Sequence, residues 1–369
     1  MKKTLTLLCI LCLVVAVASG CSSPAAAPAA NTPSPAAGEV ITWKIQGFQS
    51  AGTTQDNYTR ALMKRIMELS NGRLQIEYYS ADAIFPNSEM GNALRDGIVD
   101  GVNFYGGQLT GIDEAFALFT STPGLFSQPI DQALWFRYGG GMELWQEMAD
   151  YYDMNQHILL TLAVDGEDFL WSNKPIREIA DMQNIIVRFM PIFGSVLADH
   201  GISINALPAT EIVPGLERGV IDAGEYSTPS TDLSMGFQDV AKYVIRPGIH
   251  QPSGNNAIAI RKDRWEALPD DLKAVVESAC AEAILNNYGA QRMDNITAMK
   301  AIEEAGIEVC FLSDDAVNTM NQWVQEWLEQ KSETNPWMKR VVDSQKEFAK
   351  NYASYSDSMN LPWPQWMLE

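Results

Sequence analysis

The chain from residue 41 onward switches between two hydrophobic periods. Residues 74–79 alternate apolar and polar side chains, which predicts a strand, and residues 41–48 are expected to form another. Between them, Leu62, Ile66 and Leu69 recur at the spacing of one helix face, so a helix is expected there. Strands and helices in alternation are typical of an α/β domain with a largely parallel sheet.

The alternation continues and then restarts after residue 164. We expect a helix at 87–97, capped by Asn87 or Ser88, and a strand at 98–107 that runs into a glycine turn. The restarted pattern predicts strands at 168–172, 185–190 and 220–227, and helices at 193–201 and 208–219.

Two of these segments resemble each other. Residues 93–106 align with residues 215–228, and the matched positions are Leu94 with Leu216, Gly97 with Gly219, Asp100 with Asp222 and Phe104 with Tyr226. Because the echo coincides with the restart, it predicts two α/β lobes of similar topology. Ligands bind outside the carboxyl ends of strands in open α/β sheets, so residues 103–105 and 225–227 are expected to line a shared cleft.

The last third of the chain is predicted to be helical at 268–306 and 313–333, with a short strand at 307–312 between the helices. Ser313 is the expected cap of the second helix. A further amphipathic stretch at 335–359 has apolar faces with nothing after it to cover them. Such a helix docks either on another chain or on its own lobe, and the sequence leaves both open.

The N-terminus has the features of an export signal. Lys2 and Lys3 precede an apolar run, and small residues precede Cys21 in the lipobox-like "ASGC". We therefore predict a signal peptide at 1–20, a lipidated Cys21 and a Pro/Ala-rich tether at 21–39. An uncleaved membrane anchor and ordinary signal cleavage are the alternatives. No later apolar stretch is long enough to span a bilayer, so the body is expected to be extracytoplasmic and lipid-anchored to a bacterial membrane.

Composition narrows the partners and the chemistry. A net charge of −20 argues against nonspecific coating of nucleic acid or of an anionic membrane surface. After processing, Cys280 and Cys310 remain, and they either form one disulfide or stay as two buried thiols. The histidines, His157, His200 and His250, are scattered, and each is expected to be a packing or surface residue rather than a metal ligand.

Arg188 is the sharpest chemical feature, because it puts a permanent charge into the apolar run "NIIVRFM" at residues 184–190. A buried charge without a partner is strongly destabilising, so a partner is required. One candidate is a buried Asp or Glu of the protein. The other is the carboxylate of a ligand, since the planar guanidinium matches a carboxylate bidentately.

Two carboxylates, Glu167 and Glu225, fall at or near predicted strand ends of the second lobe. Together they would repel a ligand carboxylate unless a cation is bound, and their hard oxygens suit Ca²⁺ or Na⁺. Without a cation, one of them would pair with Arg188. Gln251 offers an amide donor and acceptor in a Pro/Gly turn. The aromatic residues that could form walls of the cleft are Phe104, Tyr105 and Tyr226.

Enzyme motifs are scarce in this chain. The sequence contains no G-x-S-x-G, no H-E-x-x-H and no P-loop. A hydrolase that uses Glu167 and Glu225 as acid and base, such as a glycosidase, stays open at this point. A structural surface lipoprotein is a further alternative.

Several of these features together resemble one family, the extracytoplasmic solute receptors of tripartite ATP-independent periplasmic (TRAP) transporters, which are DctP-like. The resemblance covers about residues 40–350 and rests on the lipobox, the two α/β lobes, "VRF" around Arg188, "GLERGVIDAGEY", "YGGGMELWQEM" and "YVIRPGIHQPSG". It is strongest to the branch that binds 2-oxo acids and lactate. The resemblance implies a two-lobed periplasmic-binding-protein-like (Venus flytrap) fold with central mixed sheets, hinge strands near 164–167 and 251–256, and a long C-terminal helical region.

The resemblance also implies roles for individual residues. Arg188 would clamp the substrate carboxylate. Glu225 would give a side-chain oxygen to the metal, and Tyr226, where the branch has tryptophan, would give a backbone carbonyl. Glu167 stands where these receptors tend to have glutamine, and Gln251 where they tend to have glutamate. A carboxylate at Glu167 would join the metal ligands and favour Ca²⁺ over Na⁺.

On this hypothesis the protein is a receptor and not an enzyme. It would capture a small 2-oxo or 2-hydroxy monocarboxylate, such as pyruvate or lactate, for secondary active uptake through TRAP permease subunits. Lobe I is expected at 40–165 and 255–293, and lobe II at 166–254 and 294–335. A helical extension at 336–369 could form a homodimer. The lobes would close around the ligand and exclude water.

Overall fold

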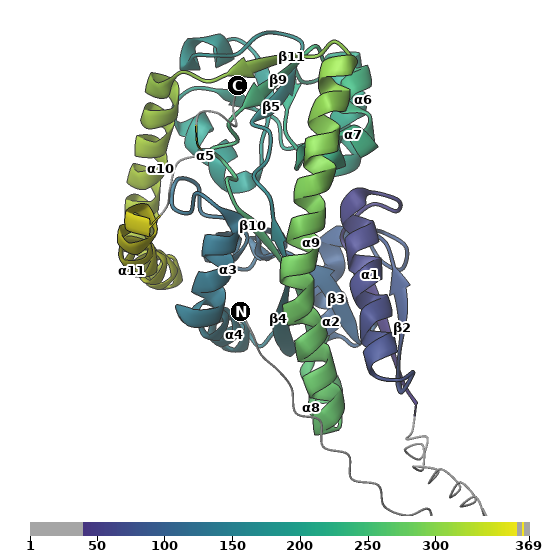
Figure 1. The fold of residues 1–369 in the computed structure, drawn as a ribbon. Helices are drawn as coiled ribbons and strands as arrows, with labels where there is room; N and C mark the ends of the chain where they lie inside the picture. The colour runs from purple at the N-terminus through teal and green to yellow at the C-terminus, as the bar shows by residue number, and fades with distance from the viewer. Residues whose placement is uncertain (1–39, 360–363, 365–369) are drawn as a thin grey trace, which may run out of the picture. The chain divides into compact units, whose positions relative to one another are not determined.

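The structure, a computed structural model, describes residues 40–359 and residue 364 (Figure 1). The predicted signal peptide, the lipidated Cys21 and the tether lie outside the described residues, as does the end of the predicted C-terminal extension. Within the described part, none of the helices combines the length and the apolar content that a membrane crossing requires.

The first of two mixed sheets has the strand order β2-β1-β3-β10-β4. Its strands are β1 (Ile41–Gly47), β2 (Leu74–Tyr79), β3 (Gly101–Phe104), β4 (Gln156–Val164) and β10 (Gly254–Arg261). Strand β1 runs parallel to β2 and β3, whereas β10 is antiparallel to β3 and β4. The parallel part is the predicted βαβ pattern, and β10 joins it from far along the chain.

The second sheet has the order β11-β9-β5-β8-β6-β7. Its strands are β5 (Leu170–Ser172), β6 (Ile186–Arg188), β7 (Ser203–Ile204), β8 (Ala223–Gly224), β9 (Tyr243–Arg246) and β11 (Glu308–Phe311). Strands β6 and β8 are shorter than the predicted 185–190 and 220–227, because the residues that follow them leave the sheet at the cavity described below. The sheets confirm the predicted α/β fold with two lobes.

Helices and short 3-10 helices connect the strands. They are α1 (Thr54–Leu69), η1 (Asn87–Glu89), α2 (Met90–Arg95), η2 (Gly106–Leu109), η3 (Glu114–Phe119), α3 (Pro129–Tyr138), α4 (Gly141–Tyr151), η4 (Ile179–Met182), α5 (Pro191–Asp199), α6 (Ala209–Arg218), α7 (Pro229–Met235), η5 (Phe237–Asp239), α8 (Lys262–Glu266), α9 (Asp270–Glu304), α10 (Asp314–Thr334) and α11 (Pro336–Met359). The predicted helix at 87–97 is divided between η1 and α2, and Pro86 holds the first N-cap position, so the predicted caps Asn87 and Ser88 are wrong. Ser313 does cap α10, since its hydroxyl accepts the backbone N–H of Ala316 at 3.1 Å.

The sequence echo corresponds to the same local structure in each lobe. Asp100 and Asp222 both precede a strand, β3 and β8. The Asp100 carboxylate accepts the backbone N–H of Lys44 at 2.8 Å, and the Asp222 carboxylate accepts that of Ile186 at 2.9 Å. Each aspartate thereby ties its strand to the parallel strand beside it, β1 or β6. The two lobes therefore share this βαβ detail as well as the general pattern.

Two chain crossings join the sheets near the predicted hinge positions. The chain leaves β4 at Val164 for β5, and it returns from β9 to β10 at Gly254. Val164 pairs with Gly254, and the backbone N–H of Glu167 donates to the carbonyl of Gln251 at 3.2 Å, so the crossings run beside each other. Helix α9 also extends along both lobes (Figure 1). It contacts β4 and α1 of the first lobe and α7 of the second.

Helix α11 packs on its own lobe through its first half. Met338, Val341 and Val342 are buried in the cluster that also holds the stacked rings of Phe119 and Trp145. The helix packs there against η3, α3 and α4 of the first lobe and against α10, whereas Tyr355 and Met359 near its end are exposed. Docking of α11 on another chain stays a prediction. The two thiols of Cys280 and Cys310 are separate, free and buried.

Candidate functional site

A cavity of about 470 Å³ lies between the carboxyl ends of strands of the two sheets. Of the residues singled out from the sequence, those that line it are Tyr105, Glu167, Arg188, Tyr226 and Gln251. Tyr105 follows β3 of the first lobe, Arg188 ends β6 of the second, Tyr226 follows β8, and Glu167 and Gln251 lie on the crossings. The βαβ topology brings these residues together because it places strand ends of both lobes at one cleft.

Arg188 is almost buried, and most of its donors bind protein oxygens. Its Nη1 donates to the backbone carbonyl of Glu225 at 2.8 Å and to the Glu225 carboxylate at 2.7 Å, while Nε donates to the carbonyl of Leu207 at 3.2 Å. For Nη2, the partner found in the described part of the chain is the sulfur of Met190, at 3.8 Å. Arg188 thus pairs with a protein carboxylate, as one of the two alternatives expected, while its Nη2 has no oxygen acceptor among the described residues.

Glu225 is completely buried behind Arg188. Its Oε1 accepts from Arg188 and from the backbone N–H of Met190, each at 2.7 Å. Its Oε2 is buried and has no hydrogen-bond partner among the described residues. Burial raises the pKa of the Glu225 carboxyl, and the Arg188 charge opposes the rise. An ionised buried carboxylate oxygen without a donor is costly, and a bound cation or a proton on this oxygen would remove that cost.

Glu167 is held in place by two neighbours from the other crossing. Its Oε1 accepts from Nε2 of Gln251 at 2.6 Å, and its Oε2 lies 3.2 Å from Nε2 of His250. Burial raises the pKa of Glu167 well above its ordinary range, and the charges of Glu225 and Asp232 add to the rise. Gln251 therefore orients the carboxylate of Glu167 as well as lining the cavity.

His250 belongs to this cluster, which the sequence analysis did not anticipate. The prediction that it is a packing residue holds in part, because its ring lies among those of Phe169, Phe189 and Phe193. Burial lowers the pKa of His250 to about 3, and Arg188 contributes to the lowering, so the ring is neutral near pH 7. Its position directly before Gln251 was the one available signal.

Glu167, Glu225 and His250 each offer a ligand atom, and these atoms lie within 4.8 Å of one another. Two carboxylates at this separation, one with an oxygen that lacks a protein donor, fit a bound cation. Hard oxygen donors suit Ca²⁺ or Na⁺, whereas the His250 nitrogen is the less suitable donor for these ions.

The aromatic residues divide between the cavity and the core. Tyr105 lines the cavity, and its ring meets that of Phe48 edge to face at 4.8 Å. Burial raises the pKa of Tyr105 to about 12, against the opposing effect of Arg188, and the pKa of Tyr226 is also raised by burial. Phe104 is 2% exposed and packs against Trp145 in the core. Its predicted place at the cleft is wrong, because the backbone stays extended from Phe104 to Tyr105 and successive side chains on an extended chain point to opposite sides.

Other residues of the cavity lining carried no signal that the sequence analysis used. The loop from β1 to α1 contributes Phe48 and Ser50, and the first turn of α1 contributes Gln55. The second lobe contributes Met190 and Ser227. Phe48 to Gln55 follow the first strand of the chain directly, so the rule that places ligands at strand ends would have found them.

Comparison with known proteins decides the family. A family model for bacterial extracellular solute-binding proteins, family 7 (DctP), matches residues 46–334. The chain belongs to this family. The family is one of extracellular solute-binding proteins and not of enzymes, so the hydrolase alternative based on Glu167 and Glu225 no longer stands. The family 7 assignment confirms the resemblance drawn from the sequence.

The family 7 chain is similar to a monocarboxylate 2-oxoacid-binding periplasmic protein of Nostoc sp., with 26% identity over 298 residues that cover 79% of this chain and 80% of the relative. A TRAP transporter solute-binding protein of Bordetella bronchiseptica, a dimer with copurified calcium and picolinate, matches with a TM-score of 0.81 and 24% identity over 87% of this chain and 95% of that one. A TRAP solute-binding protein of Pseudoalteromonas atlantica, with bound sodium and pyruvate, matches with a TM-score of 0.80 and 23% identity over 87% of this chain and 97% of that one. At these identities the solved structures support the fold.

Proposed function

We propose that this family 7 receptor binds a small 2-oxo or 2-hydroxy monocarboxylate, such as pyruvate or lactate, through Arg188 and a bound cation. The observation that carries the proposal is the free edge of Arg188 in the cavity. Among the described residues, Nη2 meets the Met190 sulfur and no oxygen. A ligand carboxylate there would accept a charge-assisted hydrogen bond at a site that is largely shielded from water.

The Glu225 pair supports this role of Arg188. Because Glu225 holds Nη1 from the side away from the free edge, the guanidinium keeps one orientation before a ligand arrives. A preorganised donor loses less side-chain entropy on binding than a mobile one. The protein carboxylate and the ligand carboxylate, which were alternatives from the sequence, thus become two partners of one arginine.

Charge balance favours a divalent cation. Glu167 and Glu225 carry two negative charges when both are ionised, and Arg188 offsets one of them. A monocarboxylate ligand would bring the total to two negative charges in a buried site, and Ca²⁺ would neutralise both whereas Na⁺ would leave one. We propose that the Glu167 and Glu225 side chains and the Tyr226 carbonyl hold this cation. When bound, it supplies positive charge for the ligand oxygens.

The relatives bear on the ligand class. The relative from Nostoc is described as binding monocarboxylate 2-oxoacids, and the Pseudoalteromonas structure holds sodium with pyruvate. A structure from Colwellia psychrerythraea, similar with a TM-score of 0.80 and 22% identity, holds calcium with pyruvate. In this chain, Tyr105 and Tyr226 would form the walls beside the ligand, and Gln251 would keep Glu167 oriented.

The remaining parts of the proposal concern location and assembly. Family 7 proteins are extracytoplasmic, and we propose anchoring through a lipid on Cys21, which rests on the sequence alone. Closure of the lobes around the ligand would give the form that TRAP permease subunits recognise. The domain boundaries at 165 and 254, and a homodimer through the exposed end of α11, also stay predictions.

The test is calorimetric titration of the purified protein with pyruvate, lactate and longer 2-oxo acids, each with Ca²⁺, with Na⁺ and with a chelator. We expect binding of at least one acid in Ca²⁺ and a clear loss of affinity with the chelator. Pyruvamide, which lacks the carboxylate, is the matched control and should not bind. Absence of binding for every acid in both ions would contradict the proposal.

A further inference from the structure

One hydrogen bond crosses the cavity from lobe to lobe. Nε2 of Gln55, in the first turn of α1, donates to Oγ of Ser227 at 2.8 Å. Gln55 follows a strand of the first sheet, and Ser227 follows β8 of the second. Both side chains line the cavity and are buried, so water competes little for this bond.

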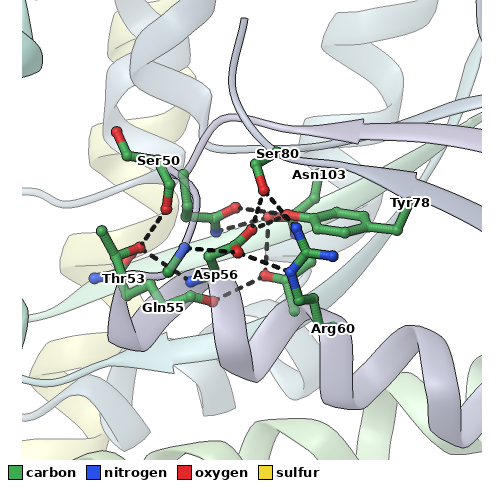
Figure 2. A network of polar contacts seen from close by, with 11 residues as sticks. Ser50, Thr53, Gln55, Asp56, Arg60, Tyr78, Ser80 and Asn103 are labelled. Atoms are coloured by element: carbon green, nitrogen blue, oxygen red, sulfur yellow. Dashed lines mark hydrogen bonds and ion pairs between the residues drawn. The ribbon is translucent and has the colours of Figure 1, made fainter. Parts of the chain in front are cut away.

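The Gln55 end of this bond is held rigidly by the neighbouring residue. Asp56 is fully buried at the centre of a polar network (Figure 2). Its carboxylate accepts from Nε of Arg60 at 2.8 Å, from the hydroxyl of Ser80 at 2.9 Å and from the hydroxyl of Tyr78 at 3.1 Å. These donors come from α1 and from β2 and its end, so the start of α1 cannot shift without breaking several bonds.

The Ser227 end is also held in place by a buried neighbour. Its backbone N–H donates to the buried carboxylate of Asp232 at 2.9 Å, which fixes its position. Its Oγ is the acceptor for Gln55. Ser227 lies two residues after Glu225, so the latch is close to the carboxylates of the site in the chain.

We propose that Gln55 and Ser227 form an interlobe latch, in which the hydrogen bond stabilises the closed cleft and thereby raises the affinity of the site for its ligand. The closed state is the binding-competent state, and the apparent dissociation constant is the intrinsic one divided by the closed fraction. Loss of the latch lowers the closed fraction. It leaves in place Arg188, Glu167 and Glu225, the side chains proposed to hold the ligand carboxylate and the cation. Gln55 and Ser227 are positioning residues in this scheme, and the affinity arm of the test rests on the proposed function.

The test is a double-mutant cycle with Gln55→Ala, Ser227→Ala and the double variant. Each single substitution should weaken acid binding about two- to tenfold. The double variant should bind the acid no more weakly than the single variant with the lower affinity, because both substitutions remove the same bond. Gln55→Met keeps the length of the side chain but not the donor, and it should match Gln55→Ala. The control is Gln75→Ala, since this exposed glutamine donates to Gly72 within its own lobe. Effects that multiply in the double variant would overturn the latch.

A second readout does not need a ligand. Spin labels at Lys64→Cys on α1 and Val220→Cys after α6 would report the distance between the lobes, since both positions are exposed. We expect Gln55→Met to shift the unliganded distribution towards longer distances relative to Gln75→Ala. An unchanged distribution would overturn the latch even if the acid binds. If no acid binds to the parent, the proposed function fails, while the label distances still decide the latch.

Discussion

Nη1 of Arg188 donates to both the carbonyl and the carboxylate of Glu225, at 2.8 and 2.7 Å, while Nη2 lies 3.8 Å from the sulfur of Met190, which lines the cavity together with Arg188. Arg188 therefore has a structural role, through its contact with Glu225, and a proposed binding role, through Nη2. The following predictions separate these two roles and test the cation and the core.

Arg188→Ala should weaken acid binding by about 30-fold or more, because truncation of one partner in a buried charged contact costs at least about 2 kcal/mol. It should also lower the free energy of unfolding by about 3 kcal/mol, since Glu225 then loses its cationic partner. Calorimetry and urea denaturation measure the two effects. The control is Arg95→Ala, whose exposed side chain pairs with the adjacent Asp96. Full affinity in a folded Arg188→Ala protein would contradict the binding role.

Glu225→Gln should weaken the affinity for Ca²⁺, because the orphaned Oε2 is replaced by one end of a neutral amide. Excess Ca²⁺ should restore part of the acid binding. Titration of acid at several Ca²⁺ concentrations measures this, with the exposed Glu217→Gln as the control. If acid binding in the parent is independent of the metal, the cation part of the proposal is wrong.

Glu167→Gln should change which ion supports binding. The substitution removes one negative charge from the buried site, so the balance that favours a divalent ion shifts towards Na⁺. An amide oxygen still accepts from Gln251, which keeps the side chain in place. Acid affinity measured in Na⁺ and in Ca²⁺ should show a smaller advantage of Ca²⁺ than in the parent. An unchanged ratio would mean that Glu167 is not a ligand of the ion.

Asp232 should make the protein less stable as the pH rises. Burial raises the pKa of its carboxyl well above the ordinary value, and the charge of Asp168 adds to the rise. The folded protein then holds this proton more tightly than the unfolded chain, in which aspartate titrates near about 3.9. The free energy of unfolding should therefore fall as the pH increases from about 4 towards the folded pKa.

Asp232→Asn tests this slope by urea denaturation from about pH 4 to 8 in Ca²⁺-free buffer. The variant lacks the carboxylate, so its stability should fall less steeply with pH than that of the parent. Its absolute stability should be lower, because an amide accepts from Trp171 and Ser227 less completely. Asp263→Asn is the control, since the pKa of this carboxyl is lowered by Arg261 and it titrates below the range. Equal slopes in parent and Asp232→Asn would contradict the prediction.

Phe104 and Tyr105 should differ in what their loss affects. Phe104→Ala should lower the free energy of unfolding by about 3–5 kcal/mol, because it leaves a hole against Trp145. Its effect on acid affinity in the folded protein should be small. Tyr105→Ala should reduce the affinity and destabilise less, since this ring is only half-buried and lines the cavity. If Phe104→Ala instead reduced the acid affinity and Tyr105→Ala caused the larger loss of stability, Phe104 would belong to the cleft.

Local sequence patterns predicted the elements and the repeated architecture of this protein. Periods of two and of about 3.6 residues located β2 and α1, and the match of Asp100 with Asp222 marked equivalent strand starts in the two lobes. These features are local, because a strand or helix buries one face wherever it lies. The resemblance of short motifs then indicated the family.

Only the tertiary structure decided which side chains meet across the cleft. Gln55 and Ser227 are 172 residues apart, and no local period relates them. His250 has an ordinary local sequence, yet the two crossings bring it to Glu167. Phe104 ends β3 and Tyr105 follows it with an extended backbone, so their side chains point to opposite sides, one into the core and the other into the cavity. Such contacts depend on how two sheets and their loops pack, which is set by many weak long-range interactions rather than by any one segment.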